Sequence, residues 1–394
     1  MSAADATVDV LIVGAGPAGA MAAVLLARAG LRVRIVERAT WPRAKVCGGC
    51  ISPAGIALLE SVGLGGLPAR AGAATFEQLV LHHRGGRHTL PLGRGVAVSR
   101  QALDAALIDE ATAQGASFTP GTRATIPQTS EPIQADPSSR PVELHSDSGT
   151  EIISTRIVLA ADGLAGPVTT AALGPPVVAA NARIGLGTVI DAPTNDYAPG
   201  TIHMGWFRHG YIGAVEVEQG RLCIAAAIGP MWLRQQPDTA AALTRAAAAA
   251  GMPPLLPVER SMLRGTPLLT RHHPILGGPR LLAVGDAAGY VEPFTGEGMT
   301  WAMASALAVT PFIMENLSRW DEATPAHWTD HWQRMLHARH RTCGLVSAAL
   351  RSGWLVPAAV RLLAECPPLA RHITAWMHRP IAMADRPFHD GGAS

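Results

Sequence analysis

Three glycines in close succession follow the first apolar segment of the chain. They form a Gly-x-Gly-x-x-Gly pattern over residues 14–19, directly after the apolar residues 8–13. In such a pattern the first glycine permits a tight turn, the second lets the backbone approach a pyrophosphate, and the third lets helix and strand pack closely. Glu37 follows 23 residues after Gly14, where a carboxylate can accept hydrogen bonds from both ribose hydroxyls. Together these residues predict a dinucleotide-binding site.

The segments around this pattern predict the elements that position it. An apolar run at 8–13, an Ala/Leu-rich stretch at about 17–29 and a second apolar run at 31–36 are typical of a βαβ unit. A later strand over 281–284 ends in Gly285-Asp286, and a long helix is expected from about 298 to 317. Two separated segments therefore carry dinucleotide chemistry.

These segments resemble the FAD-dependent oxidoreductases of the p-hydroxybenzoate hydroxylase superfamily. In that superfamily the matching aspartate binds the flavin ribityl chain, which implies this role for Asp286. The stretch matching residues 293–298 presents backbone N–H groups and a helix N-terminus to the flavin ring, where a reduced flavin carries negative charge. The resemblance implies FAD as cofactor, bound by Gly14, Gly16, Pro17, Ala18, Gly19, Glu37, Arg38, Lys45, Cys47, Gly48, Arg100, Asp162, Gly285, Asp286, Pro293, Gly296, Gly298 and Met299.

Two further segments match the superfamily. Arg100 resembles the arginine that leads a family helix, which implies contact with the FAD phosphates or the adenine side. Asp162-Gly163 resembles the family's Asp-Gly motif, but Gly166 and Thr169 stand where Ser and Arg usually follow. NAD(P)H is therefore a possible electron donor that this segment does not establish.

A narrower resemblance concerns residues 43–50 and 292–299, which are similar to the geranylgeranyl reductase branch. In that branch a Cys-Gly-Gly loop lies beside the isoalloxazine. Cys47 could simply pack against the flavin, could position substrate, or could form a redox pair with Cys50, because CxxC thiols react as thiolates. The remaining cysteines do not supply the spacing of a zinc site, so no metal is expected.

The substrate site is expected on an antiparallel sheet formed by segments within 184–228, which in the superfamily roofs the flavin. Trp206, Phe207 and Tyr211 lie on it and are candidates for pocket lining, although they could equally be core aromatics. Phe294, in the turn matching the reductases, is a further candidate. The sequence contains no obvious dedicated proton donor, and we take Cys47 and Tyr211 as candidate catalytic residues.

The predicted fold is α/β: a GR2-type Rossmann-like FAD-binding fold with an antiparallel β-sheet substrate domain and a C-terminal helical segment. The FAD-binding domain is noncontiguous and comprises 1–75, 97–175 and 275–325. The substrate domain comprises 76–96 and 176–274, and the helical segment comprises 326–394.

Composition narrows the class of protein further. The 394 residues include 32 Lys and Arg against 30 Asp and Glu, a formal net charge of +2, and the basic residues are dispersed. Nucleic acid is therefore not an expected partner. The N-terminus has no basic segment followed by an apolar one, so a cytoplasmic protein is expected. The C-terminal helices combine apolar and basic residues and would suit contact with a membrane surface or a carrier protein, although packing explains them equally well.

The sequence predicts an enzyme, an FAD-dependent oxidoreductase that acts on a hydrophobic small molecule. We favour reduction of a double bond by hydride transfer from the flavin. One alternative is a flavin-dependent monooxygenase that hydroxylates an aromatic or polyketide-like substrate. Another is a flavoprotein maturation factor that acts on a protein or carrier-bound substrate. The first two use the same FAD site and differ only in pocket residues.

Overall fold

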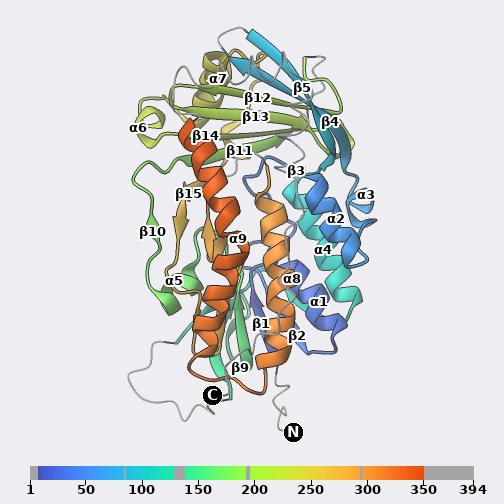
Figure 1. Ribbon diagram of the computed structural model, residues 1–394, viewed down its shortest axis with the longest axis vertical. Helices are drawn as coiled ribbons and strands as arrows, with labels where there is room; N and C mark the ends of the chain where they lie inside the picture. Colours follow the sequence, from blue (N-terminus) through green and yellow to red (C-terminus); the bar gives the residue numbers. More distant parts are fainter. Residues whose placement is uncertain (1–7, 84–85, 128–137, 192–195, 293–295, 350–394) are drawn as a thin grey trace.

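The computed structural model describes residues 8–83, 86–127, 138–191, 196–292 and 296–349. Within them the chain forms two large sheets and one small sheet. The large sheets lie at opposite ends of an elongated molecule, and the helices α8 (Gly298–Asn316) and α9 (Thr324–Ala349) run along its length (Figure 1). The α/β prediction is confirmed. The C-terminal contact surface expected above falls largely on residues 350–394, outside the described residues.

The first large sheet has a parallel centre. Strand β1 (Val8–Val13) pairs in parallel with β2 (Val33–Val36) on one side and with β9 (Gly149–Ala160) on the other. The central strands are runs of Val, Ile and Leu because helices cover one face and a smaller layer covers the other. The remaining strands of this sheet are β6 (Ser117–Thr119), β7 (Arg123–Thr125), β8 (Arg140–Ser146), β17 (Gly277–Gly278) and β18 (Leu281–Ala283).

Helix α1 (Pro17–Arg28) connects β1 to β2, and its buried residues belong to the main hydrophobic core of this domain. Ten of its residues are buried, and most of them are alanine or other small residues. This small surface lets α1 pack closely against α8 and against α4 (Arg100–Ala113). The end of α1 nearest the glycine motif is thereby held in place.

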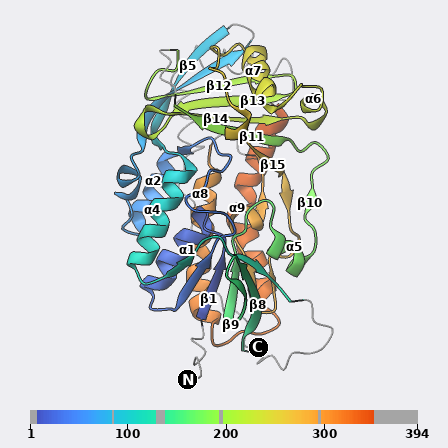
Figure 2. The same cartoon turned by 180° about the vertical axis from the view of Figure 1, so that it is seen from behind.

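The second large sheet is almost entirely antiparallel, and one parallel pairing joins β4 to β12. Helix α7 (Thr239–Ala250) covers one of its faces (Figure 2). The other face is turned toward the first domain. Its strands, in spatial order, are β15 (Arg264–Leu268), β11 (Ile184–Ile190), β14 (Leu222–Ile228), β13 (Gly210–Glu216), β12 (Thr201–Phe207), β4 (Ala74–His83), β5 (Gly86–Ala97) and β3 (Cys50–Ile51).

Short elements join the two sheets. A three-stranded sheet lies between them and consists of β10 (Val177–Val178), β16 (Arg271–His272) and β19 (Gly289–Tyr290). The other helices are α2 (Pro53–Ser61), α3 (Leu67–Arg70), α5 (Pro167–Leu173) and α6 (Pro230–Leu233), with single 3-10 turns at Glu218–Gly220, Arg260–Met262 and Gly285–Ala287.

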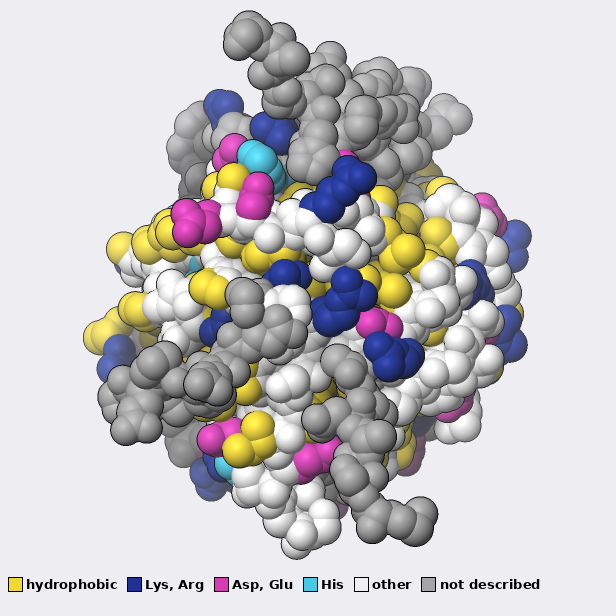
Figure 3. All heavy atoms as spheres, turned by 90° about the horizontal axis from the view of Figure 1, so that it is seen from below, with side chains coloured by type: hydrophobic (Ala, Val, Ile, Leu, Met, Phe, Trp, Pro, Cys, Tyr) yellow, Lys and Arg dark blue, Asp and Glu magenta, His cyan; other side chains and the backbone are white. Residues whose placement is uncertain are grey.

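Across the described part of the chain, no helix combines the length and the apolar character needed to cross a bilayer. Figure 3 shows the molecule from below. On the visible part of that face, basic, acidic and apolar side chains are interspersed. The dispersed charge of the sequence is thus reproduced on this part of the folded surface.

Candidate active site

The glycine motif forms the turn from β1 into α1. Gly14 has φ +107°, and a Cβ there would lie 2.3 Å from the carbonyl oxygen of Ala161. A Cβ at Gly19 would lie 2.0 Å from the carbonyl oxygen of Gly14. Both positions therefore exclude any other residue, and the turn brings the N-terminus of α1 to the edge of the sheet. No side chain caps this N-terminus, so its positive dipole end is available to an anion.

Two arginines lie over this turn. A Cβ at Gly16 would be 3.3 Å from Nη2 of Arg100 and 3.9 Å from Nη2 of Arg43. The Asp104 carboxylate accepts hydrogen bonds from Arg43 at 2.7 Å and from Arg100 at 2.9 Å. Two guanidinium groups, a helix N-terminus and a residue without a side chain meet at one point. This is an electropositive cradle suited to a pyrophosphate.

Glu37 lies beside the cradle, at the end of β2. Its carboxylate accepts hydrogen bonds from the backbone N–H groups of Ala15 and Ala39 and from Nε of Arg43, the last at 2.9 Å. Burial by itself would raise the pKa of Glu37, but the charge of Arg43 and these hydrogen bonds bring it below its usual value. Glu37 is therefore ionised and oriented, as a ribose-binding carboxylate must be.

Asp286 lies on the opposite side of the same cavity. It lies in the 3-10 turn that begins at Gly285, a residue with φ +60° whose Cβ would lie 2.8 Å from the Cβ of Ala18. Burial raises the pKa of Asp286 to about 6, against the opposing charges of Arg100 and Lys45. Hydrogen bonds from hydroxyl groups, such as those of a ribityl chain, would stabilise the ionised form of this buried carboxylate.

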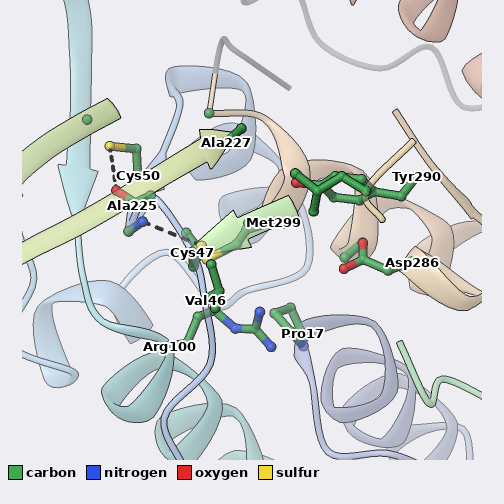
Figure 4. Close-up of a pocket in the computed structure, with 18 of the residues that line it drawn as sticks. Pro17, Val46, Cys47, Cys50, Arg100, Ala225, Ala227, Asp286, Tyr290 and Met299 are labelled. Atoms are coloured by element: carbon green, nitrogen blue, oxygen red, sulfur yellow. Dashed lines mark hydrogen bonds between the residues drawn. The ribbon is translucent and has the colours of Figure 1, made fainter. Parts of the chain in front are cut away.

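A single cavity of about 260 Å³ joins these parts to the second sheet. Figure 4 shows Pro17 and Arg100 at its lower end, Asp286 and Tyr290 on one side, Cys47 on the other, and β14 passing above. Most of the lining is apolar. The sheet contributes Phe76, Leu79, Leu92, Gly185, Ile202, Met204, Tyr211, Gly213, Ala214, Val215, Ala225, Ala226 and Ala227.

The Cys-Gly-Gly-Cys loop forms one wall of the cavity, and Cys47 and Cys50 both line it. The Cys47 sulfur accepts a hydrogen bond from the Gly49 amide at 3.4 Å, while the Cys50 thiol donates to the Gly48 carbonyl at 3.3 Å. Burial raises the pKa of both thiols. A third thiol, that of Cys223 on β14, donates to the Cys47 carbonyl at 3.2 Å and fixes the loop to the sheet.

Tyr211 lines the cavity and has a buried ion pair beside it. Arg183 and Glu292 are joined at 2.5 Å, and both are more than nine-tenths buried. The Arg183 guanidinium lies 5.6 Å from the centre of the Tyr211 ring. Burial, followed by the charge of Glu292, holds the pKa of Tyr211 well above its usual value.

Other predicted residues lie apart from the cavity. Phe207 packs on the opposite face of the sheet with the core beneath α7, because side chains alternate along β12. Trp206 is buried against Leu81 and stacks on His83 at 4.5 Å. Asp162 accepts hydrogen bonds from the backbone of Val168 and Thr169 and from the Thr169 hydroxyl, so it caps α5.

The other residues predicted to bind FAD fall into two groups, those that line the cavity and those that do not. Arg38 and Lys45 are exposed and do not line the cavity, whereas Pro17, Ala18, Gly48, Gly296, Gly298 and Met299 do. Gly298 and Met299 begin α8, so a second helix N-terminus reaches the cavity. Pro293 and Phe294 lie outside the described residues.

The donor set fits FAD. Gly16, Pro17 and Arg100 line the cavity, so a pyrophosphate there would meet a guanidinium and the N-terminus of α1. Glu37 offers an ionised carboxylate for a ribose, and the Asp286 carboxylate lies beside an apolar cavity. This combination defines a dinucleotide-binding flavoprotein of the Rossmann-like class.

Comparison with known proteins establishes the family. A model of the FAD binding domain matches residues 7–323, and the chain belongs to that family. Menaquinone reductase of Mycobacterium tuberculosis is 34% identical over 177 residues, which cover 42% of this chain and 40% of that protein. Menaquinone reductase of Mycolicibacterium smegmatis is 24% identical, with 90% of this chain and 91% of that protein covered. A flavoprotein/dehydrogenase structure from Cytophaga hutchinsonii superposes with a TM-score of 0.76 at 18% identity, covering 94% of this chain and 92% of that one.

The predicted FAD-binding fold, the cofactor FAD and the class of enzyme, an FAD-dependent oxidoreductase, are thereby confirmed. Several residues of the site were not among the candidates drawn from the sequence. These are Arg43, Asp104, Arg183, Tyr290 and Glu292. Arg43 and Glu292 lie in the two segments that resemble the reductases and Asp104 lies one helical turn after Arg100, whereas Arg183 and Tyr290 carry no motif. Glu292 had one usable signal, since it is a carboxylate that directly follows a mainly apolar segment, residues 281–291.

Proposed function

We propose that this enzyme reduces a carbon–carbon double bond of a hydrophobic small molecule. The observation that carries the proposal is the continuity of the cavity. One space begins at the Gly16 cradle, passes Cys47 and Asp286, and ends on a sheet face of aliphatic residues, alanine and glycine. A molecule that fits this end is apolar, and the relatives named menaquinone reductase point in the same direction.

The resemblance of residues 43–50 and 292–299 to the geranylgeranyl reductase branch also supports this assignment. In the proposed enzyme Glu37, Arg43 and Arg100 hold the adenosine and pyrophosphate side of FAD, and Asp286 holds the ribityl side. Bound FAD would supply hydride chemistry at the inner end of the cavity. The apolar walls orient the substrate and keep water away from it.

Reduction of an alkene also requires a proton, and Cys47 is the better of the two candidate donors. Burial raises the pKa of its thiol, so the sulfur retains its proton at neutral pH while facing the cavity. Tyr211 is a poorer proton source, because burial and the charge of Glu292 hold its pKa well above its usual value. We therefore assign the proton to Sγ of Cys47 and a binding role to Tyr211.

The electron donor is proposed to be something other than NAD(P)H bound through the Asp-Gly segment. Thr169 is fully buried and hydrogen-bonded to Asp162 at 2.6 Å, so neither side chain is presented to a ligand. Direct reduction by NADPH should therefore be slow compared with reduction by dithionite.

The test is anaerobic single turnover. Holoenzyme reduced with dithionite is mixed under nitrogen with a panel of polyprenyl compounds, including menaquinone, and the flavin spectrum and product mass are followed. We expect reoxidation of the flavin and a product heavier by two hydrogen atoms. Rapid reduction by NADPH, followed in oxygen by a product heavier by one oxygen atom, would instead establish a monooxygenase.

A further inference from the structure

One polar side chain of the cavity remains unassigned once the FAD cradle and the thiol loop are accounted for. Ser52 and Thr266 line the cavity and already make hydrogen bonds within the protein. The Tyr211 ring lies under the guanidinium of a buried ion pair. Asp286 and Tyr290, in contrast, have no hydrogen-bond partner within the described part of the chain. Since Asp286 is expected to bind the ribityl chain, the Tyr290 hydroxyl is left to another ligand.

The fold directs Tyr290 into the cavity. Its strand, β19, follows the turn that carries Asp286 after a single residue, and consecutive residues of a strand face opposite sides. Gly289 faces helix α9, because a Cβ there would lie 3.3 Å from the indole ring of Trp332. Tyr290 therefore faces away from α9, and Figure 4 shows its ring extending into the cavity that it lines.

The Tyr290 hydroxyl is suited to donate a hydrogen bond to a ligand. Burial holds the pKa of Tyr290 well above its usual value, and the charge of Asp286 acts in the same direction. The hydroxyl therefore keeps its proton. Most of the cavity lining is apolar, including Ala227 and Met299. A ligand that fills this space displaces water from the hydroxyl and must then offer an acceptor atom, because an unpaired donor in apolar surroundings is costly.

We propose that Tyr290 is a catalytic residue that donates a hydrogen bond to a carbonyl oxygen of the substrate, and that this carbonyl is conjugated with the double bond to be reduced. The substrate is then an apolar α,β-unsaturated carbonyl compound rather than a plain alkene. This inference rests on the proposed function, because it names the substrate class of the same cavity.

The hydrogen bond from Tyr290 stabilises the charge that the reaction creates. Hydride, which the proposed function already supplies, adds to the β-carbon, so that the carbon–carbon π bond breaks and an electron pair moves to the carbonyl oxygen. The Tyr290 hydroxyl faces that developing charge and keeps its own proton. The proton on Sγ of Cys47 then joins the α-carbon, the carbonyl forms again, and the thiolate regains a proton from solvent. The substrate gains two hydrogen atoms in all.

Binding to the oxidised holoenzyme tests the hydrogen bond without turnover. The probes are 4-phenylbutan-2-one and 2-methyl-4-phenylbut-1-ene, in which a CH2 group replaces the carbonyl oxygen. Neither probe is conjugated, so the Cys47 thiol does not add to it. Calorimetry gives the ratio of the two affinities in each protein, and infrared spectroscopy with a carbon-13 carbonyl label gives the stretching frequency of the bound ketone. In the natural protein this frequency should lie below its value in an apolar solvent.

Two variants locate the hydrogen bond. In Tyr290→Phe the ratio of ketone to hydrocarbon affinity should fall about tenfold, the value of one hydrogen bond, and the carbonyl frequency should rise. In the matched control Tyr211→Phe, which alters the other tyrosine of the cavity, the ratio and the frequency should stay as in the natural protein. An unchanged ratio and frequency in Tyr290→Phe would overturn the proposal, as would changes confined to Tyr211→Phe. A loss of FAD affinity in Tyr290→Phe without a change in the ratio would also overturn it.

Single turnover of the reduced enzyme with 4-phenylbut-3-en-2-one tests the catalytic role. Removal of one donor to a developing oxyanion slows such reactions by about 100-fold or more, so the rate should fall by that factor in Tyr290→Phe. Equal rates in the two proteins would contradict the catalytic role of Tyr290. Failure of the proposed reductase function is a separate result, because the natural protein would then form no two-hydrogen product while the binding ratio still depended on Tyr290.

Discussion

Arg43 donates a 2.7 Å hydrogen bond to the carboxylate of Asp104, although 61 residues separate them in sequence. Asp104 is fully buried at the first turns of α4, and it also accepts two hydrogen bonds from Arg100. Arg43 in turn contacts Glu37. A single carboxylate thus fixes both guanidinium groups over the Gly16 turn, and through Arg43 it is linked to the carboxylate expected to bind the ribose.

Asp104→Asn should weaken FAD binding and also lower the stability of the apoprotein. The amide keeps the shape but removes the charge that balances two buried arginines, and breaking such a pair costs about 3 kcal/mol or more. Loss of the fixed arginine geometry should weaken FAD affinity by about tenfold or more. Titration of the apoprotein with FAD and thermal unfolding measure the two effects. Asp109→Asn, on the exposed side of the same helix, is the control and should change neither.

Cys47→Ser should lower turnover strongly, whereas Cys50→Ser should leave it largely intact. A serine hydroxyl is a far weaker acid than a thiol and is a poor source of the proton assigned to Cys47, while the Cys50 thiol donates only to a neighbouring carbonyl. FAD affinity should be retained in both variants, and single-turnover rates with reduced enzyme separate them. Equal and nearly complete loss in both would favour a dithiol mechanism.

The FAD-binding part of the fold could be predicted from sequence because its residues recur at fixed spacings. A side chain at Gly14, Gly19 or Gly285 would meet Ala161, Gly14 or Ala18, respectively, at less than 3 Å, so only glycine fits and a recognisable pattern results. Glu37 follows at a spacing set by the βαβ unit itself. The contacts of Gly14 and Gly285 are with distant parts of the chain, but the glycines that they require can be read from the sequence alone.

The substrate side could not be predicted in the same way because it depends on long-range pairing. Trp206 and Phe207 are adjacent aromatics on opposite faces of β12: Phe207 faces the core beneath α7, whereas Trp206 shares the face of Tyr211 but lies beyond the residues that line the cavity. Arg183 and Glu292 are 109 residues apart and meet only because the second sheet lies against the first domain. The sequence contains both charges but nothing that pairs them.

Asp286→Asn should stabilise the apoprotein at neutral pH while weakening FAD binding. Burial raises the pKa of Asp286 to about 6, so the folded state favours the protonated acid, and stability is lost as pH rises from about 4 through 6. Asparagine carries no charge to desolvate, so the gain should reach at most about 3 kcal/mol above pH 7. Thermal unfolding of both apoproteins at pH 4.5 and 7.5 should show a difference that is about three times larger at the higher pH. A variant that is less stable at both values would contradict the prediction.

The buried pair His82–His203 should make the protein sensitive to mild acid. The two rings are 3.2 Å apart at Nε2 and Nδ1, and burial, together with the neighbouring His82, lowers the pKa of His203 to about 4. A folded-state pKa below the unfolded value means that stability is fully present above about pH 6.5 and is lost as pH falls toward 4. The loss of stability from His203 should be about 2 kcal/mol at pH 5.

Urea unfolding at pH 7.5 and 5 measures this loss. The free energy of unfolding should fall less between the two pH values in His203→Gln than in the natural protein. The control variant His88→Gln, on the partly exposed strand β5, should show the same fall as the natural protein. Equal losses in all three proteins would show that His203 does not titrate in this way.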